Sequence, residues 1–466
     1  MSERADIHNL AAGPSPLPTP VLQKAAEGLL NYNGTGMGVC ELSHRGKEFK
    51  AIVEGAEGKL LCKRGPQLSL ISCLPLPQAN LRKLLAIPDT HAIFFTQGGG
   101  TQQFSSTLLN ILSYHRIRRE QLGQKEFKPP TIDYVVTGSW SSKASAEAKR
   151  LAVPPIPGAE PFAKIHVAAT TKATGFNTLP AREAYDFSFK ADAKEEDTNT
   201  AFVYYCENET INGVEFPADA SAPGAFPFEL VPAHVPIVAD YSSSFISRPI
   251  PNVERHAVIY AGAQKNLGPA GTTVVIVRKD LLVDTTEALL LGNVPAVPIE
   301  LEYKTLADNG SLYNTPPVFA IYVSALVLEY LLNEKGGIEG VAATNERKAK
   351  KLYQALARAE EKNVLKVKVK QPEAQSWMNV TFEVVAREGE DREKEFLAEA
   401  EKRGFRQIKG HRSIGGKHVR LLPLTRLFRL QLSSTAGIRA SLYNAVTEES
   451  VDALVKFIDE FVANHA

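Results

Sequence analysis

Cysteine is scarce in this chain of 466 residues, which contains four: Cys40, Cys62, Cys73 and Cys206. No two of them have the CxxC spacing of a zinc site, and four are too few to staple a chain of this length with disulfides. We therefore expect neither a metal site nor a disulfide framework, and we expect a reducing, cytoplasmic setting.

An excess of one charge sign is also missing, because 53 Lys and Arg residues face 52 Asp and Glu residues. Without a polybasic or polyacidic tract, neither nucleic acid nor a membrane surface is an expected partner. No apolar run approaches the roughly 20 residues that span a bilayer. The opening MSERADIHNL mixes both charge signs and lacks an apolar segment, so it does not have the pattern of a signal or transit peptide.

Short apolar strands alternate with helical patterns over the first two thirds of the chain. The strands are predicted at residues 92–96, 132–137, 201–206, 236–240 and on both sides of Lys265. Such alternation is typical of an α/β domain whose mostly parallel sheet is covered on both faces. From about Gly336 the pattern changes to charged amphipathic helices and short strands, which predicts a smaller α+β domain.

Lys265 stands in a turn rich in glycine and alanine, within VIYAGAQKNLGPAGTTVVIV (residues 258–277). The β-branched runs on both sides predict buried strands. A lysine amine that is withdrawn from water loses proton affinity and can condense with a carbonyl to give a Schiff base. We therefore predict that Lys265 holds pyridoxal 5′-phosphate, although a solvated lysine in a hairpin turn has the same pattern.

Three further features follow strands. The turn QGGGTQQF (97–104) leads into a helix and can present N–H groups to a phosphate, or it can be a flexible turn. Trp140 could stack on a flat ligand or pack into the core. Asp240 ends the strand at 236–240 and could pair with a protonated pyridine nitrogen, or cap the turn that follows it.

Nine motifs taken together resemble the phosphoserine aminotransferase family, whose members have the aspartate-aminotransferase-like fold, fold type I. In chain order they are AAGPSPLP, SHRGKEF, QGGGTQQF, TGSW, ENETINGVEF, VADYSSS, YAGAQKNLGPAG, DNGSLYNTPP, and GHRSIGG with IRASLYNA after an interruption. The resemblance implies a large domain over residues 17–330 with a mostly parallel seven-stranded sheet. It also implies a small α+β domain made of residues 1–16 and 331–466.

The resemblance also implies a role for each matching residue. Lys265 would bind the cofactor and shuttle a proton, Asp240 would bind the pyridine nitrogen, and Trp140 would stack on the ring. Other cofactor contacts would come from Gly100, Thr101, Thr210 and Gln264, and from Asn314 and Thr315 of the second subunit of a homodimer. The phosphate and carboxylate of the substrate would be received by His44, Arg45, His411, Arg412 and Arg439.

The implied reaction is transamination of 3-phosphohydroxypyruvate with L-glutamate, which gives O-phospho-L-serine and 2-oxoglutarate in L-serine biosynthesis. The residue types suit this chemistry. A freed lysine amine can take the α-proton, and an aspartate can keep the ring cationic so that it accepts electrons. Arginine binds carboxylate and phosphate groups in bidentate fashion.

Two segments of 21 residues each, 58–78 and 417–437, interrupt these patterns. The first contains prolines, Pro75 and Pro77 among them, that should exclude a helix, yet deleting it restores one amphipathic face. Each begins at a Gly-Lys pair, which a splice-donor sequence can encode. We hypothesise two retained introns, without which 424 residues and a net charge of −6 would remain. Genuine surface insertions are the alternative, and the second segment could displace Arg439.

Other functions are compatible with parts of the pattern. Another fold type I aminotransferase or a cysteine desulfurase would share the lysine, but a desulfurase needs a mobile catalytic cysteine. A dimeric protein that kept the fold and lost turnover through the two segments is a second alternative. A nucleotide-binding enzyme is a third, although the glycine turn lacks the lysine of a P-loop.

Overall fold

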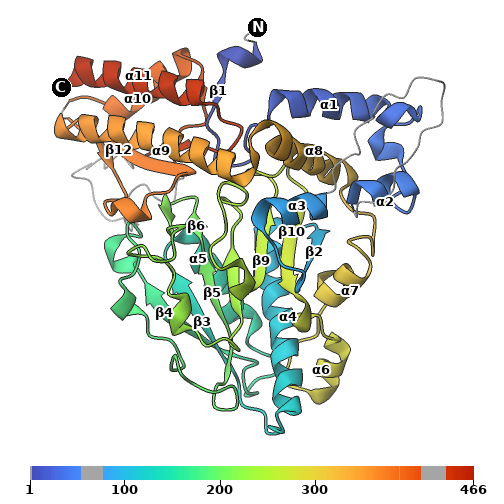
Figure 1. Ribbon diagram of the computed structural model, residues 1–466. Coiled ribbons are helices and arrows are strands. Elements are labelled where there is room, and N and C mark those ends of the chain that lie inside the picture. Colours follow the sequence, from blue (N-terminus) through green and yellow to red (C-terminus); the bar gives the residue numbers. More distant parts are fainter. Residues whose placement is uncertain (1–2, 54–76, 388, 411–436) are drawn as a thin grey trace, which may run out of the picture.

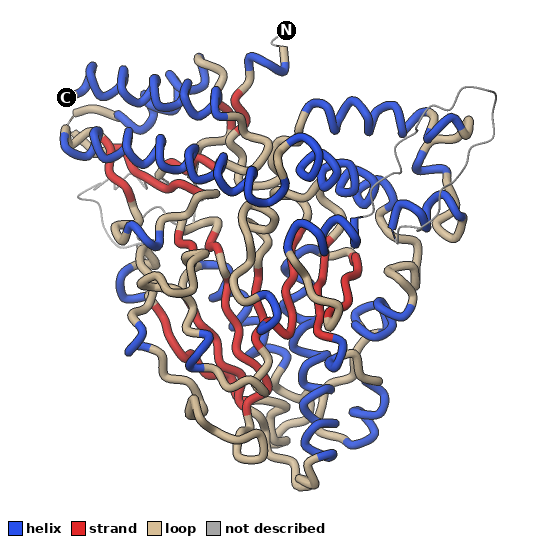
Figure 2. Tube along the Cα trace, in the orientation of Figure 1, coloured by secondary structure: helices blue, strands red, loops and turns tan. Residues whose placement is uncertain are grey.

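The computed structural model describes residues 3–53, 77–387, 389–410 and 437–466. A seven-stranded sheet lies at its centre, in the order β2-β10-β9-β8-β5-β3-β4 (Figures 1 and 2). Only β10 runs antiparallel to its neighbours, which confirms the predicted mostly parallel sheet. The strands are β2 (His91–Thr96), β3 (Thr131–Val136), β4 (Lys164–Thr170), β5 (Thr200–Cys206), β8 (Ile237–Asp240), β9 (His256–Gly262) and β10 (Thr273–Arg278).

Both faces of this sheet are buried against helices. Successive side chains of a strand point to opposite faces, so neighbouring residues belong to different apolar clusters. Phe95 belongs to one apolar cluster and Phe94 to the other. The Phe95 side is covered by α1 (Thr19–Leu30), α2 (Lys47–Val53), α3 (Pro77–Leu85) and α8 (Val318–Glu334). The Phe94 side is covered by α4 (Gly99–Gln121), α5 (Ser139–Leu151), α6 (Thr285–Leu291) and α7 (Tyr303–Asp308). Burial on both faces explains why these strands are continuous apolar runs in the sequence and do not alternate with polar residues.

The first interrupting segment, 58–78, lies outside the described residues apart from Pro77 and Gln78. Helices α2 and α3 flank it, both pack against α8, and their buried side chains belong to one apolar cluster. This arrangement agrees with the shared amphipathic face read from the sequence. The expectation that Pro77 cannot be helical is wrong, because α3 begins at Pro77 and a proline is tolerated in the first turn of a helix.

The C-terminal part forms a separate layer, seen at the upper left of Figure 1. Its three-stranded antiparallel sheet has the order β11-β12-β14 and shares an apolar cluster with helices α9, α10 and α11. The short strand β1 (His8–Asn9) pairs with β13 (Phe405–Arg406), which supports the proposed assignment of residues 1–16 to this layer. The remaining elements are α9 (Gly337–Glu361), β11 (Leu365–Val367), β12 (Asn379–Val384), α10 (Arg392–Lys402), β14 (Ile438–Ser441) and α11 (Glu448–His465).

The change of pattern near residue 336 coincides with the break between α8 and α9. Gly336 has a φ of +72°, a conformation that glycine adopts without steric cost. Within the described ranges, no helix is both long and apolar enough to cross a bilayer.

Candidate active site

A cavity opens at the carboxyl edge of the central sheet, where β5, β8 and β9 end. Seven of the residues predicted from the sequence to hold the cofactor line it together: Gly100, Thr101, Trp140, Thr210, Asp240, Gln264 and Lys265. They come from the first turns of α4 and α5, the hairpin of β6 (Asn208–Glu209) and β7 (Val214–Glu215), the end of β8, and the turn between β9 and β10. Phe104, Cys206, Asn208, Ser242 and Ser243 complete the lining.

Lys265 is withdrawn from solvent, with 7% of its surface exposed. Its Nζ donates a hydrogen bond to Thr210 Oγ1 at 3.1 Å. Its aliphatic stem packs under Gly13, where an added Cβ would come within 2.7 Å of Lys265 Cε, and where a φ of +123° favours glycine. The alternative of a solvated lysine in a surface turn is therefore wrong.

The N-terminal segment around Gly13 covers this lysine and is itself held from two sides. Ser15 N donates to Gln264 O at 2.9 Å, in the turn that carries Lys265. Tyr443 Oη donates to Ala12 O at 3.0 Å from the C-terminal layer. In the sequence, AAGPSPLP is one of the motifs that carry the family resemblance, and nothing in its spacing points to the lysine.

Asp240 uses one carboxylate oxygen to cap a turn, since Oδ1 accepts a hydrogen bond from Ser242 N at 2.9 Å. Its other oxygen faces the start of α4, because a Cβ added to Gly100 would lie 3.6 Å from Asp240 Oδ2 and 3.2 Å from Ser242 Oγ. Burial raises the pKa of Asp240. Both sequence readings of this residue are therefore compatible with its position.

The first turn of α4 borders the cavity at Gly100 and Thr101. The preceding Gly98 and Gly99 have φ values of +85° and +65°, which turn the chain sharply from β2 into the helix. The leading N–H groups of a helix have no acceptor within it, and they attract anions. A phosphate group is the ligand that this turn suits.

Trp140 is half-buried in the first turn of α5 and lines the cavity, while part of its ring packs against the Phe94-side cluster. Lys143 Nζ lies 4.1 Å from the centre of the indole ring. The backbone N–H of Trp140 donates a hydrogen bond to Glu209 Oε2 at 2.7 Å. Trp140 thus packs partly against the core and also borders the cavity, and its stacking on a cofactor ring stays a prediction.

These surroundings fit pyridoxal 5′-phosphate. The cavity holds a desolvated amine, an indole, a glycine-lined helix start for a phosphate, and a buried carboxylate. A cationic ring nitrogen opposite Asp240 would offset the cost of burying its charge. The glycine at position 100 leaves open the space that any side chain would fill.

Asn314 and Thr315 lie outside this cavity and are exposed. Gln97 Nε2 donates to Thr315 O at 3.4 Å, and Thr315 Oγ1 lies 3.4 Å from His44 Nδ1. Arg45 is exposed nearby in sequence. Within one chain, these four predicted site residues do not meet Lys265.

Arg439 lies beside the cavity, where Nη1 donates to the backbone oxygen of Thr210 at 3.3 Å. The interruption before it therefore does not displace this arginine from Thr210. Segment 417–437 is outside the described residues except for Gly437, and so are the predicted His411 and Arg412.

Cys206 lines the cavity but has the wrong character for a desulfurase. It ends β5 with 3% of its surface exposed, and its Sγ lies 3.5 Å from Asn208 O. Burial raises the pKa of its thiol, whereas a nucleophilic cysteine needs an accessible thiolate. Cys40 is exposed and does not line the cavity.

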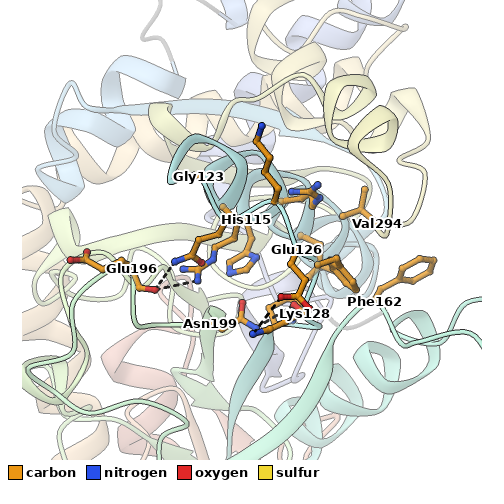
Figure 3. Close-up of a pocket in the computed structure, with 15 residues that line it drawn as sticks. His115, Gly123, Glu126, Lys128, Phe162, Glu196, Asn199 and Val294 are labelled. Carbon is orange, nitrogen blue, oxygen red and sulfur yellow. Dashed lines mark hydrogen bonds and ion pairs between the residues drawn. The ribbon is translucent and has the colours of Figure 1, made fainter.

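A larger cavity, of about 540 Å³, lies at the opposite edge of the sheet. Figure 3 shows His115, Glu196 and Asn199 along its wall, with hydrogen bonds drawn between lining residues. Its Arg119 donates to the backbone oxygens of Glu195 and Thr198 at 3.0 and 2.8 Å, so this cation is occupied in holding a loop. Volume alone does not identify the active site.

The comparisons with known proteins agree with this geometry. Residues 161–454 match the family model described as aminotransferase class-V. A putative phosphoserine aminotransferase of Schizosaccharomyces pombe is 39% identical, and the match covers 100% of both chains. The solved phosphoserine aminotransferase of Bacillus circulans subsp. alkalophilus has a TM-score of 0.74 and 34% identity over 100% of both chains. The PLP-bound enzyme of Trichomonas vaginalis has a TM-score of 0.71 and 31% identity, over 97% of this chain and 99% of that one.

These matches confirm the predicted fold type I architecture and the prediction of an aminotransferase. The residue pattern, the cavity around Lys265 and the matched relatives lead to one family: the chain belongs to the class-V aminotransferases, among the phosphoserine aminotransferases.

Proposed function

We propose that this protein transfers the amino group of L-glutamate to 3-phosphohydroxypyruvate, giving 2-oxoglutarate and O-phospho-L-serine for L-serine biosynthesis. The observation that carries the proposal is the buried Lys265 amine, 3.1 Å from Thr210 Oγ1, in a cavity that Asp240 and Trp140 also line. The names of the relatives point to phosphoserine, and the cavity brings together groups that suit the cofactor.

The cofactor of this reaction is pyridoxal 5′-phosphate. When bound, it supplies an aldehyde that condenses with amines and a ring that takes up electrons. Lys265 would bind it and then move the α-proton of the substrate. Asp240 would hold a proton on the ring nitrogen, and Trp140 would cover one face of the ring. Thr210, whose Oγ1 accepts a hydrogen bond from Lys265 Nζ, would orient that amine.

The substrate's anionic groups would be bound by cations around the cavity. Arg439 lies beside the backbone oxygen of Thr210, and its planar guanidinium suits a carboxylate. We assign the phosphate to His44, Arg45, His411 and Arg412. Two anionic groups on the keto acid require this number of donors, because each group accepts several hydrogen bonds.

We also propose a homodimer in which Asn314 and Thr315 complete the site of the second subunit. Their exposure, and their distance from the cavity of their own chain, support a contribution in trans. Three apolar residues are exposed in the chain near His44 and Asn314: Leu30, Met37 and Tyr313 are 83%, 45% and 40% exposed. Such residues are suited to burial between subunits.

Hybrid dimers test the trans arrangement. One subunit would carry Lys265→Ala and the other Asn314→Ala with Thr315→Ala. If the proposal is right, the hybrid regains one intact site and roughly half the activity of the parent dimer, although each variant alone is inactive. A hybrid as inactive as its parents would contradict it.

The overall reaction is tested on the purified protein by following glutamate-dependent formation of phosphoserine, with and without residues 58–78 and 417–437. The expected result is turnover in at least the shortened form, with the cofactor bound. Binding of the cofactor without conversion of 3-phosphohydroxypyruvate would contradict the proposed substrate. The proposal includes a reducing, cytoplasmic location, supported by the free thiols of Cys40 and Cys206.

A further inference from the structure

The hairpin β6–β7 carries two buried carboxylates that each hold the backbone of a tryptophan. Glu209 is 0% exposed and accepts from Trp140 N at 2.7 Å, while Glu215 is 2% exposed and accepts from Trp377 N at 2.6 Å. The sequence contains only these two tryptophans. One of them lines the candidate site and the other does not.

Glu209 makes an unusually complete set of contacts with the start of α5. Its Oε1 accepts from Ser141 N at 2.8 Å and from Ser141 Oγ at 2.5 Å, and its Oε2 accepts from Trp140 N. Asn212 Oδ1, in the same hairpin, accepts from Ser139 N at 2.9 Å. The first three N–H groups of α5 are therefore all satisfied by the hairpin and not by solvent.

The approach between hairpin and helix is close enough to require glycine at position 138. A Cβ added there would lie 2.3 Å from Glu209 Cδ, so a larger residue would push this carboxylate away from the N–H groups that it binds. A negative group at a helix N-terminus is also stabilised by the helix dipole. Glu209 thus fixes where α5 begins, and with it the position of Trp140.

The next residue, Thr210, receives the hydrogen bond of Lys265 Nζ and accepts Arg439 Nη1 at its backbone oxygen. One short hairpin therefore contacts both the start of the helix that carries the indole and the amine of Lys265, two groups that line the same cavity. We propose that Glu209 is a positioning residue, which sets Trp140 against Lys265 for the cofactor. This inference rests on the proposed function for the identity of the cofactor.

An amide cannot replace this carboxylate, because both of its oxygens accept hydrogen bonds from N–H groups. In Glu209→Gln, one N–H of α5 would face the NH₂ of the new side chain. Glu215→Gln is the matched control, since it places the same change at a buried carboxylate of the same hairpin, next to Trp377.

The test uses Trp377→Phe as the parent, so that Trp140 is the only tryptophan. Acrylamide quenching of Trp140 is measured in the cofactor-free protein, and the Kd for pyridoxal 5′-phosphate is measured by titration. We expect Glu209→Gln to raise the quenching constant about twofold and the Kd at least about tenfold. Glu215→Gln should leave both within about twofold of the parent, even where it lowers thermal stability.

Unchanged quenching and Kd in Glu209→Gln would overturn the inference, and so would equal changes in the Glu215→Gln control. If Glu209→Gln does not fold, Glu209→Asp is measured in its place, because it keeps the charge and loses the reach. A parent that binds no pyridoxal 5′-phosphate would instead contradict the proposed function, while the quenching of Trp140 would still test Glu209.

Discussion

Both edges of the central sheet place charged side chains beside a cavity, but these side chains have different hydrogen-bond partners at the two edges. At the carboxyl edge, Lys265 and Asp240 are buried and turned toward a cavity. At the amino edge, Arg119 beside the larger cavity is held by three backbone oxygens, of Glu195, Glu196 and Thr198. A polar side chain whose hydrogen bonds all go to the protein's backbone stabilises the fold. A polar side chain that faces a cavity can instead bind a ligand. The direction of polar groups, more than cavity size, separates the two edges.

The largest effect is expected at Lys265. Lys265→Ala removes the amine that would bind the cofactor and move the α-proton, so kcat should fall by at least about 10³-fold. The measurement is phosphoserine formation at saturating substrate, with circular dichroism as the check on folding. Retention of more than a tenth of the parent kcat would show that the carboxyl edge is not the catalytic one.

A large effect is also expected at Asp240. Asp240→Asn keeps the shape and can still accept from Ser242 N, but it removes the negative charge opposite the ring nitrogen. We expect kcat to fall about 10²- to 10³-fold, as it does when a single electrostatic contact to the reacting centre is removed. Asp240→Glu, which keeps the charge, should lose less, and equal losses in both variants would contradict an electrostatic role.

Arg439 should affect binding more than turnover. Arg439→Ala removes a guanidinium beside Thr210, and the KM for L-glutamate should rise roughly 10- to 100-fold, the value of a charge-assisted hydrogen bond. Arg439→Lys keeps the charge but lacks the planar guanidinium, so its KM for L-glutamate should lie between those of the parent and of Arg439→Ala. A KM that stays at the parent value in Arg439→Ala would remove Arg439 from the substrate site.

The amino edge should respond in stability alone. Arg119→Ala removes one donor from each of the backbone oxygens of Glu195, Glu196 and Thr198. It should lower the free energy of unfolding by about 1–3 kcal/mol. Urea unfolding measures this loss. Both kcat and KM should stay within about twofold of the parent, and a selective loss of activity would break the contrast between the edges.

The smallest effect is a pH dependence at the amino edge. Burial lowers the pKa of His256 from 6.5 to about 3, and its ring lies between Tyr205 Oη at 2.7 Å and Asn252 O at 3.1 Å. Below pH 6.5 the unfolded chain binds a proton that the folded chain excludes, so stability falls as the pH decreases from 6.5 toward 3. Between pH 7.5 and 5.5 this one group should lower the free energy of unfolding by about 1 kcal/mol.

His256→Gln should make the difference in unfolding free energy between pH 7.5 and 5.5 smaller by that amount. Activity measured at pH 7.5 should not change, because His256 stands at the start of β9 while Lys265 follows its end. An unaltered pH difference would mean that the folded protein already accepts the proton.

The sequence predicted the sheet and most of the site because the decisive residues stand next to strand ends. Lys265, Asp240 and Trp140 each follow an apolar, β-branched run, and parallel strands bring such ends to one edge. The local pattern therefore located the site before any long-range contact was known. Arg439 came instead from the family resemblance, and the structure places it on β14 with its Nη1 beside the backbone oxygen of Thr210.

Contacts between distant parts of the chain could not be predicted in this way. Glu209 binds the start of α5 across 69 residues, and neither its neighbours nor its spacing distinguish it from Glu207. Glu207 instead accepts from Arg248 Nη2 at 2.5 Å, in a buried group that also contains Glu215. The assignment of Asn314 and Thr315 to a second subunit likewise came from the resemblance, and their exposure within one chain supports it.

Residues 10–13, which cover Lys265, are hydrogen-bonded to residues more than 400 positions later in the chain. Ser441 N donates to Leu10 O at 3.2 Å, and Tyr443 Oη donates to Ala12 O. The same segment is tied to the turn of Lys265 through Ser15 N and Gln264 O. A substitution at residue 441 or 443, far along the chain from Lys265, should therefore reach the lysine through the backbone of residues 10–13.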